Sequence, residues 1–297
     1  MMKLLPSLKQ LEYLTALAGT HHFGRASELC SITPSTLSAG IRDLEAILGI
    51  SLAERTKRKV LMTPLGLEIA AKAQQLLRDA EDIMELAAAH REPLTGDMKL
   101  GVIPTIAPFV LPKVTPVLND MYPDLRLYLR EEPTQSLLTQ LHAGDIDIAL
   151  IALPFETGDL VTRVLFDDEF QFACNSNHPL SAQPKIDVAD LADKPLLLLE
   201  EGHCLRGHAL EACRIHESQI RTQFEATSLH TLVQMVSAGL GVTLLPHLAI
   251  ESGIIDGTKI QLTPMRDAAF RQIGLAWRSS SPRVAEFELL ADIFSDR

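Results

Sequence analysis

The chain has 297 residues, which exceeds the length of one ordinary hydrophobic core and predicts two or three domains. Its composition, 46% hydrophobic and 22% charged, is that of a globular protein and excludes an intrinsically disordered one. The net charge of -11 alone would argue against nucleic acid, but residues 1–66 contain eight Lys/Arg and five Asp/Glu, which gives them +3 and leaves -14 for the remainder. This asymmetry predicts DNA binding by the N-terminal segment.

The N-terminus shows no signal peptide pattern, because Pro6 and Lys9 interrupt its short apolar patch, and the apolar runs elsewhere are too short to span a membrane. We therefore expect a cytoplasmic protein with no membrane partner. In the cytoplasm its four cysteines are not expected to form permanent structural disulfides, and they include no CxxC pair of the zinc-finger kind. These cysteines are Cys30, Cys174, Cys204 and Cys213.

Three short helices are predicted in the first fifty residues. Apolar residues recur at helical spacing over residues 8–18 and 23–30. A brief turn then leads to a third helix, in which Thr33 is the N-cap, Pro34 is the first helical residue, and Gly49 marks the end. The exposed side of this helix has small side chains and one cation, which allows a close approach to a DNA groove. Its members are Ser35, Thr36, Ser38, Ala39 and Arg42.

A basic run, residues 55–59, precedes the strand-like residues 60–63. Such a run in isolation is most often a solvated turn. Beside a helix-turn-helix of the right length, we interpret it as the tip of a two-stranded wing that contacts DNA through Arg55, Lys57 and Arg58.

The first 66 residues resemble the DNA-binding domain of LysR-type transcriptional regulators. The resemblance runs in order through residues 23–29 (FGRASEL), 36–38, 41–45, 48–49 and 63–66. It implies a winged helix-turn-helix over residues 1–62 that binds promoter double-stranded DNA, with Arg25 and Pro34 among the contact residues. Many members have Gln-Pro at the start of the recognition helix, where this chain has Pro34-Ser35. The operator preference of other members therefore does not transfer.

A long linker helix is predicted from Thr63-Pro64 to about Ala89, within a linker segment of residues 63–92, followed by a hinge at residues 93–96. Its apolar stripe is close to a heptad seam. Nothing nearby in sequence buries this stripe, which predicts pairing with the same helix of a second chain. A helix packed inside its own monomer is the alternative. Resemblance to LysR-type linkers favours a homodimer or homotetramer on two DNA half-sites.

From Met98 onward, short apolar strands alternate with helices, which predicts an α/β domain with a parallel, doubly wound sheet over residues 93–297. This part resembles the two-lobed LysR effector domain, which looks like a periplasmic binding protein; residues 236–246 are similar to a stretch typical of that family. Ligands in such folds lie at the carboxyl ends of strands and at helix N-termini. Thr105, Thr134 and Ser228 are therefore candidate cleft residues, although each could equally be only a helix N-cap.

The segment 200–213 contains two cysteines beside groups that can activate a thiol. A thiolate, not a thiol, attacks peroxide, so a sensor cysteine needs neighbours that lower its pKa. His203 and Arg206 flank Cys204, and Arg206 remains cationic. Attack on peroxide yields a sulfenic acid, which a second thiol can resolve to a disulfide, and Cys213 is the candidate.

The spacing of this segment predicts a switch. We expect Gly207 to precede a helix that buries Leu210 and Cys213, with Cys204 on the loop before it. The two cysteines would then lie too far apart for a disulfide. Forming the bond would force the helix to unwind and its surroundings to repack.

This region resembles the peroxide-sensing OxyR branch of LysR-type regulators, through residues 103–112, residues 202–206 with Cys213, and residues 226–229. The resemblance implies that Cys204 is the peroxidatic cysteine and Cys213 the resolving one. It further implies a supporting shell of Thr105, Thr134, His203, Arg206 and Arg271. Gln223 and Glu225 depart from the basic residues of some members, and the direction of their effect stays open.

The sequence is thus interpreted as a transcription factor activated by hydrogen peroxide through a Cys204–Cys213 switch, with RNA polymerase as a further partner and no cofactor. One alternative is a LysR-type regulator of a small organic effector, with incidental cysteines. Another is a thiol peroxidase, against which the DNA-binding segment counts. A zinc or copper site in the Cys/His cluster (His203, Cys204, His208, Cys213, His216) is a further alternative, but its spacing matches no structural zinc pattern. Cys30 and Cys174 are interpreted as inert.

Overall fold

The computed structural model describes residues 5–55, 60–89, 93–191, 194–212, 225–267 and 269–296, with the backbone alone at 55, 85–89 and 212. The chain divides into two compact units, Met1–Ala88 and Ala89–Arg297. No described helix is long and apolar enough to cross a membrane.

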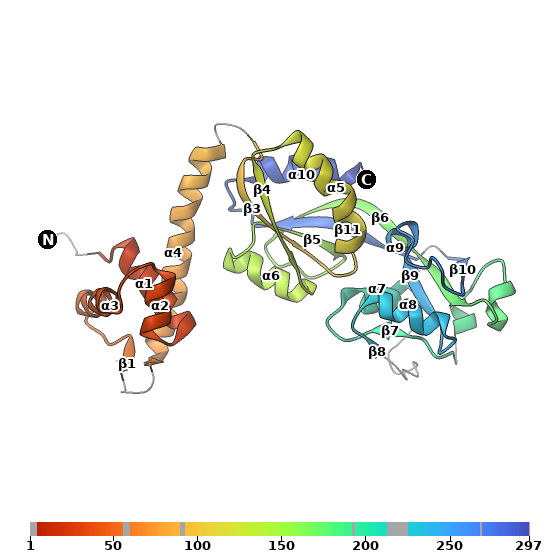
Figure 1. Ribbon diagram of the computed structural model, residues 1–297, viewed down its shortest axis with the longest axis horizontal. Helices are drawn as coiled ribbons and strands as arrows, with labels where there is room; N and C mark the ends of the chain where they lie inside the picture. Colours follow the sequence, from red (N-terminus) through yellow and green to blue (C-terminus); the bar gives the residue numbers. More distant parts are fainter. Residues whose placement is uncertain are drawn as a thin grey trace. The chain divides into compact units, whose positions relative to one another are not determined.

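The first unit is a helix-turn-helix with a two-stranded wing and a long helix (Figure 1). The third helix begins as its sequence predicts, because the Thr33 hydroxyl accepts a hydrogen bond from the Thr36 amide and Pro34 occupies the first turn. The unit's elements are α1 (Leu8–Thr20), α2 (Phe23–Leu29), α3 (Pro34–Leu48), β1 (Ala53–Arg55), β2 (Val60–Met62) and α4 (Pro64–Ala89). Its core is formed by Leu14, Leu17, Leu37, Ile41 and Leu44, which are fully buried.

The start of α4 is fixed to the wing. The Thr63 hydroxyl accepts a hydrogen bond from the Gly66 amide (2.9 Å) and so caps the helix. A Cβ at Gly66 would lie 2.1 Å from the carbonyl oxygen of Leu52, so only glycine fits this close approach. The wing itself is antiparallel, with Ala53 opposite Met62, as predicted.

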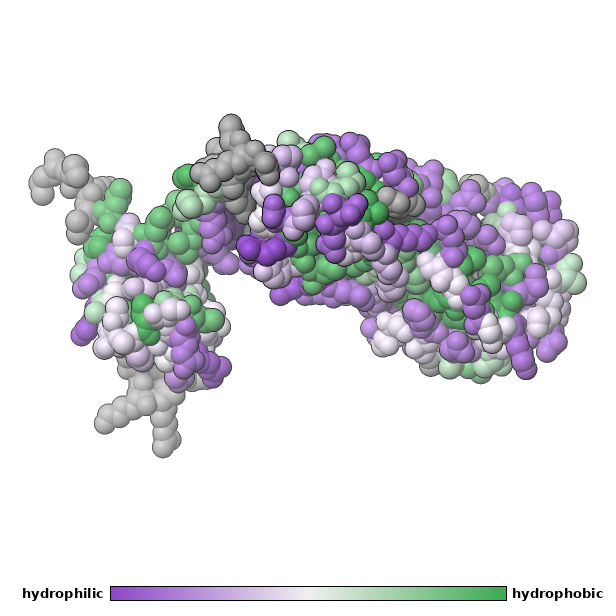
Figure 2. Space-filling view, turned by 45° about the horizontal axis from the view of Figure 1, so that its top comes forward, coloured by the Kyte–Doolittle hydropathy of each residue, from purple (hydrophilic) through white to green (hydrophobic). Residues whose placement is uncertain are grey.

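Only part of the apolar stripe of α4 is buried within the first unit. Ala70 and Ala73 pack in its core. Farther along the helix, Leu76, Ile83 and Met84 remain 52%, 68% and 73% exposed. Hydrophobic side chains therefore lie at the surface along α4 (Figure 2). Exposed apolar side chains gathered in this way are typical of a surface that another protein segment covers.

The second unit is an α/β domain of two lobes (Figure 1). The first lobe contains β3 (Gly96–Val102), α5 (Ala107–Met121), β4 (Leu125–Glu131), α6 (Thr134–Ala143), β5 (Ile148–Leu153) and α10 (Val284–Ser295). The second lobe contains the 3-10 helices Pro179–Ala182 and Val188–Leu191, together with β7 (Leu198–Leu199), α7 (Cys204–Ala212), β8 (Glu225–Ala226), α8 (Leu229–Ser237), β9 (Thr243–Pro246), α9 (His247–Glu251) and β10 (Ile260–Pro264). Two long strands, β6 (Val161–Asn175) and β11 (Phe270–Trp277), extend from one lobe toward the other.

The main sheet is mixed, so the predicted parallel sheet is only partly correct. Its order is β10-β6-β11-β5-β3-β4, and β9 also pairs with β6. Only the β4-β3-β5 part is parallel, whereas β11 is antiparallel to both β5 and β6. A parallel neighbour needs a long crossover, but residues 154–160 between β5 and β6 provide no helix. After β5 the chain therefore continues through β6 into the second lobe, and it returns to the first lobe through β11.

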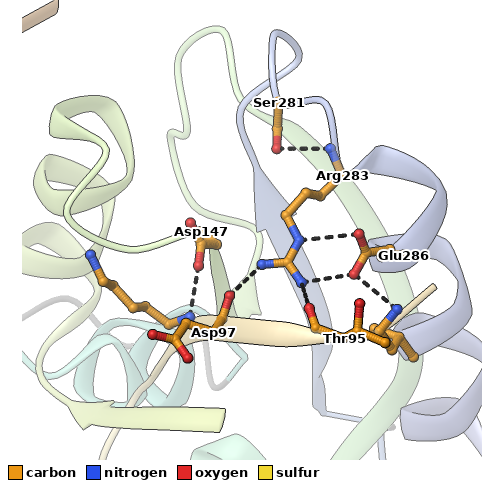
Figure 3. Close-up of polar contacts among 8 residues, drawn as sticks. Thr95, Asp97, Asp147, Ser281, Arg283 and Glu286 are labelled. Atoms are coloured by element: carbon orange, nitrogen blue, oxygen red, sulfur yellow. Dashed lines mark hydrogen bonds and ion pairs between the residues drawn. The ribbon is translucent and has the colours of Figure 1, made fainter. Parts of the chain in front are cut away.

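The predicted hinge at residues 93–96 is held to the C-terminal helix by a buried ion pair (Figure 3). Arg283 Nη2 lies 2.8 Å from Glu286 Oε2, and both side chains are buried. The same carboxylate accepts from the Leu94 amide (3.1 Å), while the guanidinium donates to the carbonyl oxygens of Thr95 and Asp97. The start of the second unit is therefore anchored within that unit by three polar contacts to the Arg283–Glu286 pair.

Candidate functional site

Cys204 is the first residue of α7, and not part of a loop as the sequence predicts. The chain turns at Gly202 (φ +97°) and the helix begins two residues later. Gly207 lies inside the helix. Because glycine is unfavourable in helix interiors, the sequence had predicted that the helix begins after Gly207. A thiol at a helix N-terminus faces the positive end of the helix dipole, and this favours its thiolate.

The pKa of Cys204 is lower than that of an ordinary thiol. Burial has the largest single effect on this pKa and acts to raise it. A hydrogen bond with His208, the charge of Arg271 and a hydrogen bond with Thr134 together outweigh burial. Cys204 is also partly exposed, unlike Cys30 and Cys174, whose thiols are buried and have a pKa that burial raises.

Arg271 is buried on β11 and held in place by three groups. Its Nε donates to Asp168 Oδ2 (2.9 Å), its Nη1 to the hydroxyl of Thr105 (2.9 Å), and its Nη2 to the carbonyl oxygen of Thr105 (3.0 Å). Asp168 is fixed in turn by the amide of Leu248 (2.9 Å). Thr105 therefore positions Arg271, and the arginine is a fixed positive charge beside the thiol.

Thr134 and His208 complete the surroundings of Cys204. Thr134 is the buried first residue of α6, and among the described residues its hydroxyl oxygen has no hydrogen-bond partner of regular geometry. His208 is also buried, and its Nε2 lies 2.9 Å from the carbonyl oxygen of Pro154, just after β5. Its Nδ1 is also buried and, among the described residues, has no hydrogen-bond partner of regular geometry. Buried polar atoms of this kind around a thiol suit the binding of a small polar ligand.

His203 and Arg206, the two predicted activators, make other contacts. His203 Nε2 lies 3.9 Å from Glu200 Oε1. Arg206 donates to the carbonyl oxygen of Leu199 (3.1 Å) and to Glu225 Oε1 (2.9 Å). Neither is among the groups that dominate the pKa of Cys204. The Arg206–Glu225 pair instead joins α7 to β8, which gives Glu225 a defined structural role.

The remaining predicted residues either have another role or cannot be placed. Ser228 is exposed and caps α8 by accepting from the Thr231 amide, which is the N-cap role left open for it. Cys213, His216 and Gln223 lie outside the described residues. Leu210 is buried on α7, as predicted. Within the described ranges, no group of His, Cys, Asp or Glu side chains is arranged to hold a metal ion.

Sequence similarity identifies the family. Residues 8–67 match the family described as "Bacterial regulatory helix-turn-helix protein, lysR family", and residues 91–297 match the "LysR substrate binding domain". The chain belongs to the LysR family. Its fold class is that of these regulators: an N-terminal helix-turn-helix followed by the α/β domain.

LysR-family relatives match over nearly the full length. The chain is 41% identical to the HTH-type transcriptional regulator EstR of Acinetobacter baylyi, over 98% of this chain and 97% of that protein. It is 39% identical to the DNA-binding transcriptional dual regulator OxyR of Escherichia coli K12, over 98% and 95%. A full-length OxyR variant from Pseudomonas aeruginosa has a similar structure, with a TM-score of 0.78, 41% identity and coverage of 97% and 94%. The relatives are transcriptional regulators and not enzymes.

In the LysR-family helix-turn-helix, the predicted DNA-contact residues of α2 and α3 are accessible. Arg25, Pro34, Ser35, Thr36 and Arg42 are exposed, and Ser38 and Ala39 are half-buried. Arg55 ends β1, whereas Lys57 and Arg58 lie outside the described residues. A helix N-terminus with small exposed side chains and a flanking cation suits entry into a major groove.

For the LysR-family effector domain, the sequence analysis missed Asp168 and named His208 only within the alternative zinc or copper cluster. His208 lies four residues after Cys204, a spacing that places both on one helix face once Cys204 is helical. Asp168 lies directly opposite Arg271 in the β6–β11 register. Asp168 is the middle residue of the acidic run 167–169, which gave no sign that it alone is buried, and its partner 103 positions later could not be identified from spacing.

Proposed function

We propose that this protein is a transcription regulator that responds to hydrogen peroxide through Cys204. The observation that carries the proposal is the Cys204 thiol at the start of α7, with a lowered pKa and with buried polar atoms of Thr134 and His208 around it. Peroxide is a small polar molecule that such groups can bind, and a thiolate attacks it. Relatives from Dickeya chrysanthemi and Haemophilus influenzae are named hydrogen peroxide-inducible genes activators.

Cys204 is the peroxidatic cysteine in this proposal. Its thiolate attacks one peroxide oxygen, and the sulfenic acid is resolved by Cys213 to a disulfide. A solved Corynebacterium glutamicum OxyR mutant, 36% identical to this chain with a TM-score of 0.68, is described as bound to hydrogen peroxide. Thr134 orients the peroxide, Thr105 and Asp168 hold Arg271, and Arg206 retains α7 against β8 until the disulfide forms.

The proposal extends to assembly and location. Residues 1–62 bind promoter DNA, residues 63–92 dimerise the protein, and residues 93–297 sense peroxide. The exposed apolar residues Leu76, Ile83 and Met84 on α4 support a helix-to-helix homodimer, two of which can form a homotetramer. The regulator acts in the cytoplasm, where it affects the recruitment or activity of RNA polymerase at its promoters.

Footprinting on a target promoter tests the function. Peroxide should change the footprint of the wild-type protein and of Cys174→Ser, because the Cys174 thiol is buried and has a raised pKa. Cys204→Ser should keep the reduced-state footprint at all peroxide concentrations. If the Cys204→Ser footprint still changes with peroxide, the proposal is wrong, and a regulator of a small organic effector becomes the better account.

A further inference from the structure

The imidazole of His208 is held in one tautomer. Its Nε2 lies 2.9 Å from the carbonyl oxygen of Pro154. A carbonyl oxygen only accepts hydrogen bonds, so Nε2 carries a hydrogen in either charge state. The second ring nitrogen, Nδ1, is therefore the atom that gains or loses a proton. Nδ1 is buried, and no regular hydrogen bond occupies it within the described part of the chain.

Cys204 and His208 interact with each other along α7. The two residues lie at positions i and i+4 of α7, one helical turn apart on the same face. Burial acts to lower the pKa of His208, but its interactions with Cys204 and with the Pro154 carbonyl raise it above its usual value. The same interaction with His208 lowers the pKa of Cys204. Together they favour a thiolate–imidazolium pair.

We propose that His208 is a catalytic residue of the peroxide reaction and protonates the oxygen that leaves. The inference rests on the proposed function of Cys204. The thiolate sulfur forms a bond to one peroxide oxygen while the O–O bond breaks. The sulfur is oxidised to a sulfenic acid, and the peroxide is reduced. The departing hydroxide takes the Nδ1 proton and leaves as water, so that His208 becomes neutral.

The other groups around the thiol are unsuited to this proton transfer. Arg271 does not deprotonate in proteins, and its guanidinium is already bound to Asp168 and Thr105. The Thr134 hydroxyl can orient peroxide by a hydrogen bond, but a hydroxyl proton is not acidic enough to neutralise hydroxide and leave a stable product. Without a donor, the site would have to release hydroxide into a buried environment, which penalises charge. General acid catalysis avoids that cost.

The side chain of His208 also borders a cavity. This cavity of about 320 Å³ is lined by His208 together with Leu153, Pro154, Glu211, Phe270 and Gln272. Glu211, whose side chain is exposed to solvent, lines the same cavity. The charged groups that face His208 are then Cys204 and Glu211 from α7 and Arg271 from β11, the last backed by Asp168 from β6.

Two reagents separate proton donation from thiol activation. Iodoacetamide releases iodide, which needs no proton, whereas hydrogen peroxide releases hydroxide. The full-length wild type and His208→Gln are compared across pH, and each peroxide rate is divided by the thiolate fraction obtained from the iodoacetamide profile. We expect the corrected peroxide rate of His208→Gln to fall about 100-fold, as is usual when a general acid is lost. His142→Gln, whose histidine pairs with Asp159, should match the wild type.

Equal corrected peroxide rates in His208→Gln and wild type would overturn the inference and reduce His208 to an activator of the thiol. The wild type provides a second arm that needs no mutant to fold. Its corrected peroxide rate should fall as the pH rises past the pKa of His208, while its iodoacetamide rate stays on its plateau; a flat corrected peroxide profile would equally overturn the inference. If wild-type Cys204 reacts with peroxide no faster than a cysteine of the unfolded chain, the proposed function itself has failed.

Discussion

Arg271 and Asp168 lie directly opposite each other on β11 and β6, and their side chains form an ion pair that is fully buried, with Nε and Oδ2 2.9 Å apart. The pair lies on the two strands that connect the lobes, and Arg271 also donates to Thr105 in the turn after β3. The positive charge of Arg271 lowers the pKa of Cys204 on α7. The Arg271–Asp168 ion pair thus joins β6 and β11, the two strands between the lobes, and also acts on the reactive thiol of Cys204.

Asp168→Asn should destabilise the second unit by about 3–5 kcal/mol, because it leaves the buried guanidinium of Arg271 without a counter-charge. Urea denaturation of the full-length protein measures this loss. The matched control is Asp187→Asn, whose carboxylate pairs with Arg266 at an exposed site and should contribute about 0–1 kcal/mol. If the two variants lost similar amounts of unfolding free energy, burial of the Arg271–Asp168 pair would not explain its contribution to stability.

Thiol labelling should distinguish the described cysteines by their environments. Because the pKa of Cys204 is lowered, it stays ionised to a lower pH than a free thiol, and its alkylation should decline only below that shifted pKa. Cys30 and Cys174 should label slowly at neutral pH, since burial raises their pKa. Thr134→Val removes a hydrogen bond to the thiolate and should move the Cys204 midpoint to higher pH. An unchanged midpoint would show that Thr134 does not stabilise the thiolate.

The sequence predicted local structure better than it predicted contacts between distant residues. The Thr33-Pro34 cap correctly located α3, and the predicted alternation of short apolar strands with helices is confirmed from β3 to β5. The Gly207 signal misplaced the start of α7, because a single glycine costs a helix only about 1 kcal/mol and tertiary packing can outweigh that. The predicted flanking activators were adjacent in sequence, whereas the groups that act on Cys204 come from α6, β11 and the next turn of α7. Those contacts depend on sheet order, which periodicity does not reveal.

Arg42→Ala should weaken binding to specific and non-specific DNA alike, because an exposed cation on α3 is placed to contact phosphate. The dependence of log affinity on log salt concentration should become shallower by about one unit for each phosphate that the variant no longer neutralises. Gel-shift titrations at several salt concentrations measure both quantities. Arg126→Ala, which removes an exposed cation from β4 of the other unit, serves as the control and should bind normally. Wild-type affinity for Arg42→Ala would exclude this side chain from the interface.

Leu76→Glu combined with Ile83→Glu should dissociate the protein, because the two substitutions place unpaired charges in the proposed seam between α4 helices. Sedimentation velocity should detect a lower mass. Gln74→Glu adds a charge to another exposed position of the same helix and should retain the wild-type mass. If the double variant sediments like the wild type, the dimer contact lies outside this stripe.

Peptide mapping shows directly whether peroxide joins Cys204 to Cys213 by a disulfide bond. The reduced full-length protein receives a short pulse of hydrogen peroxide, its remaining thiols are blocked, and the digest is analysed by mass spectrometry without reduction. The account predicts a disulfide-linked pair of peptides containing residues 204 and 213, with Cys30 and Cys174 blocked as free thiols. In Cys213→Ser, the same pulse should leave sulfenic or over-oxidised Cys204. An unmodified Cys204, or a wild-type digest without the 204–213 peptide pair, would contradict the account.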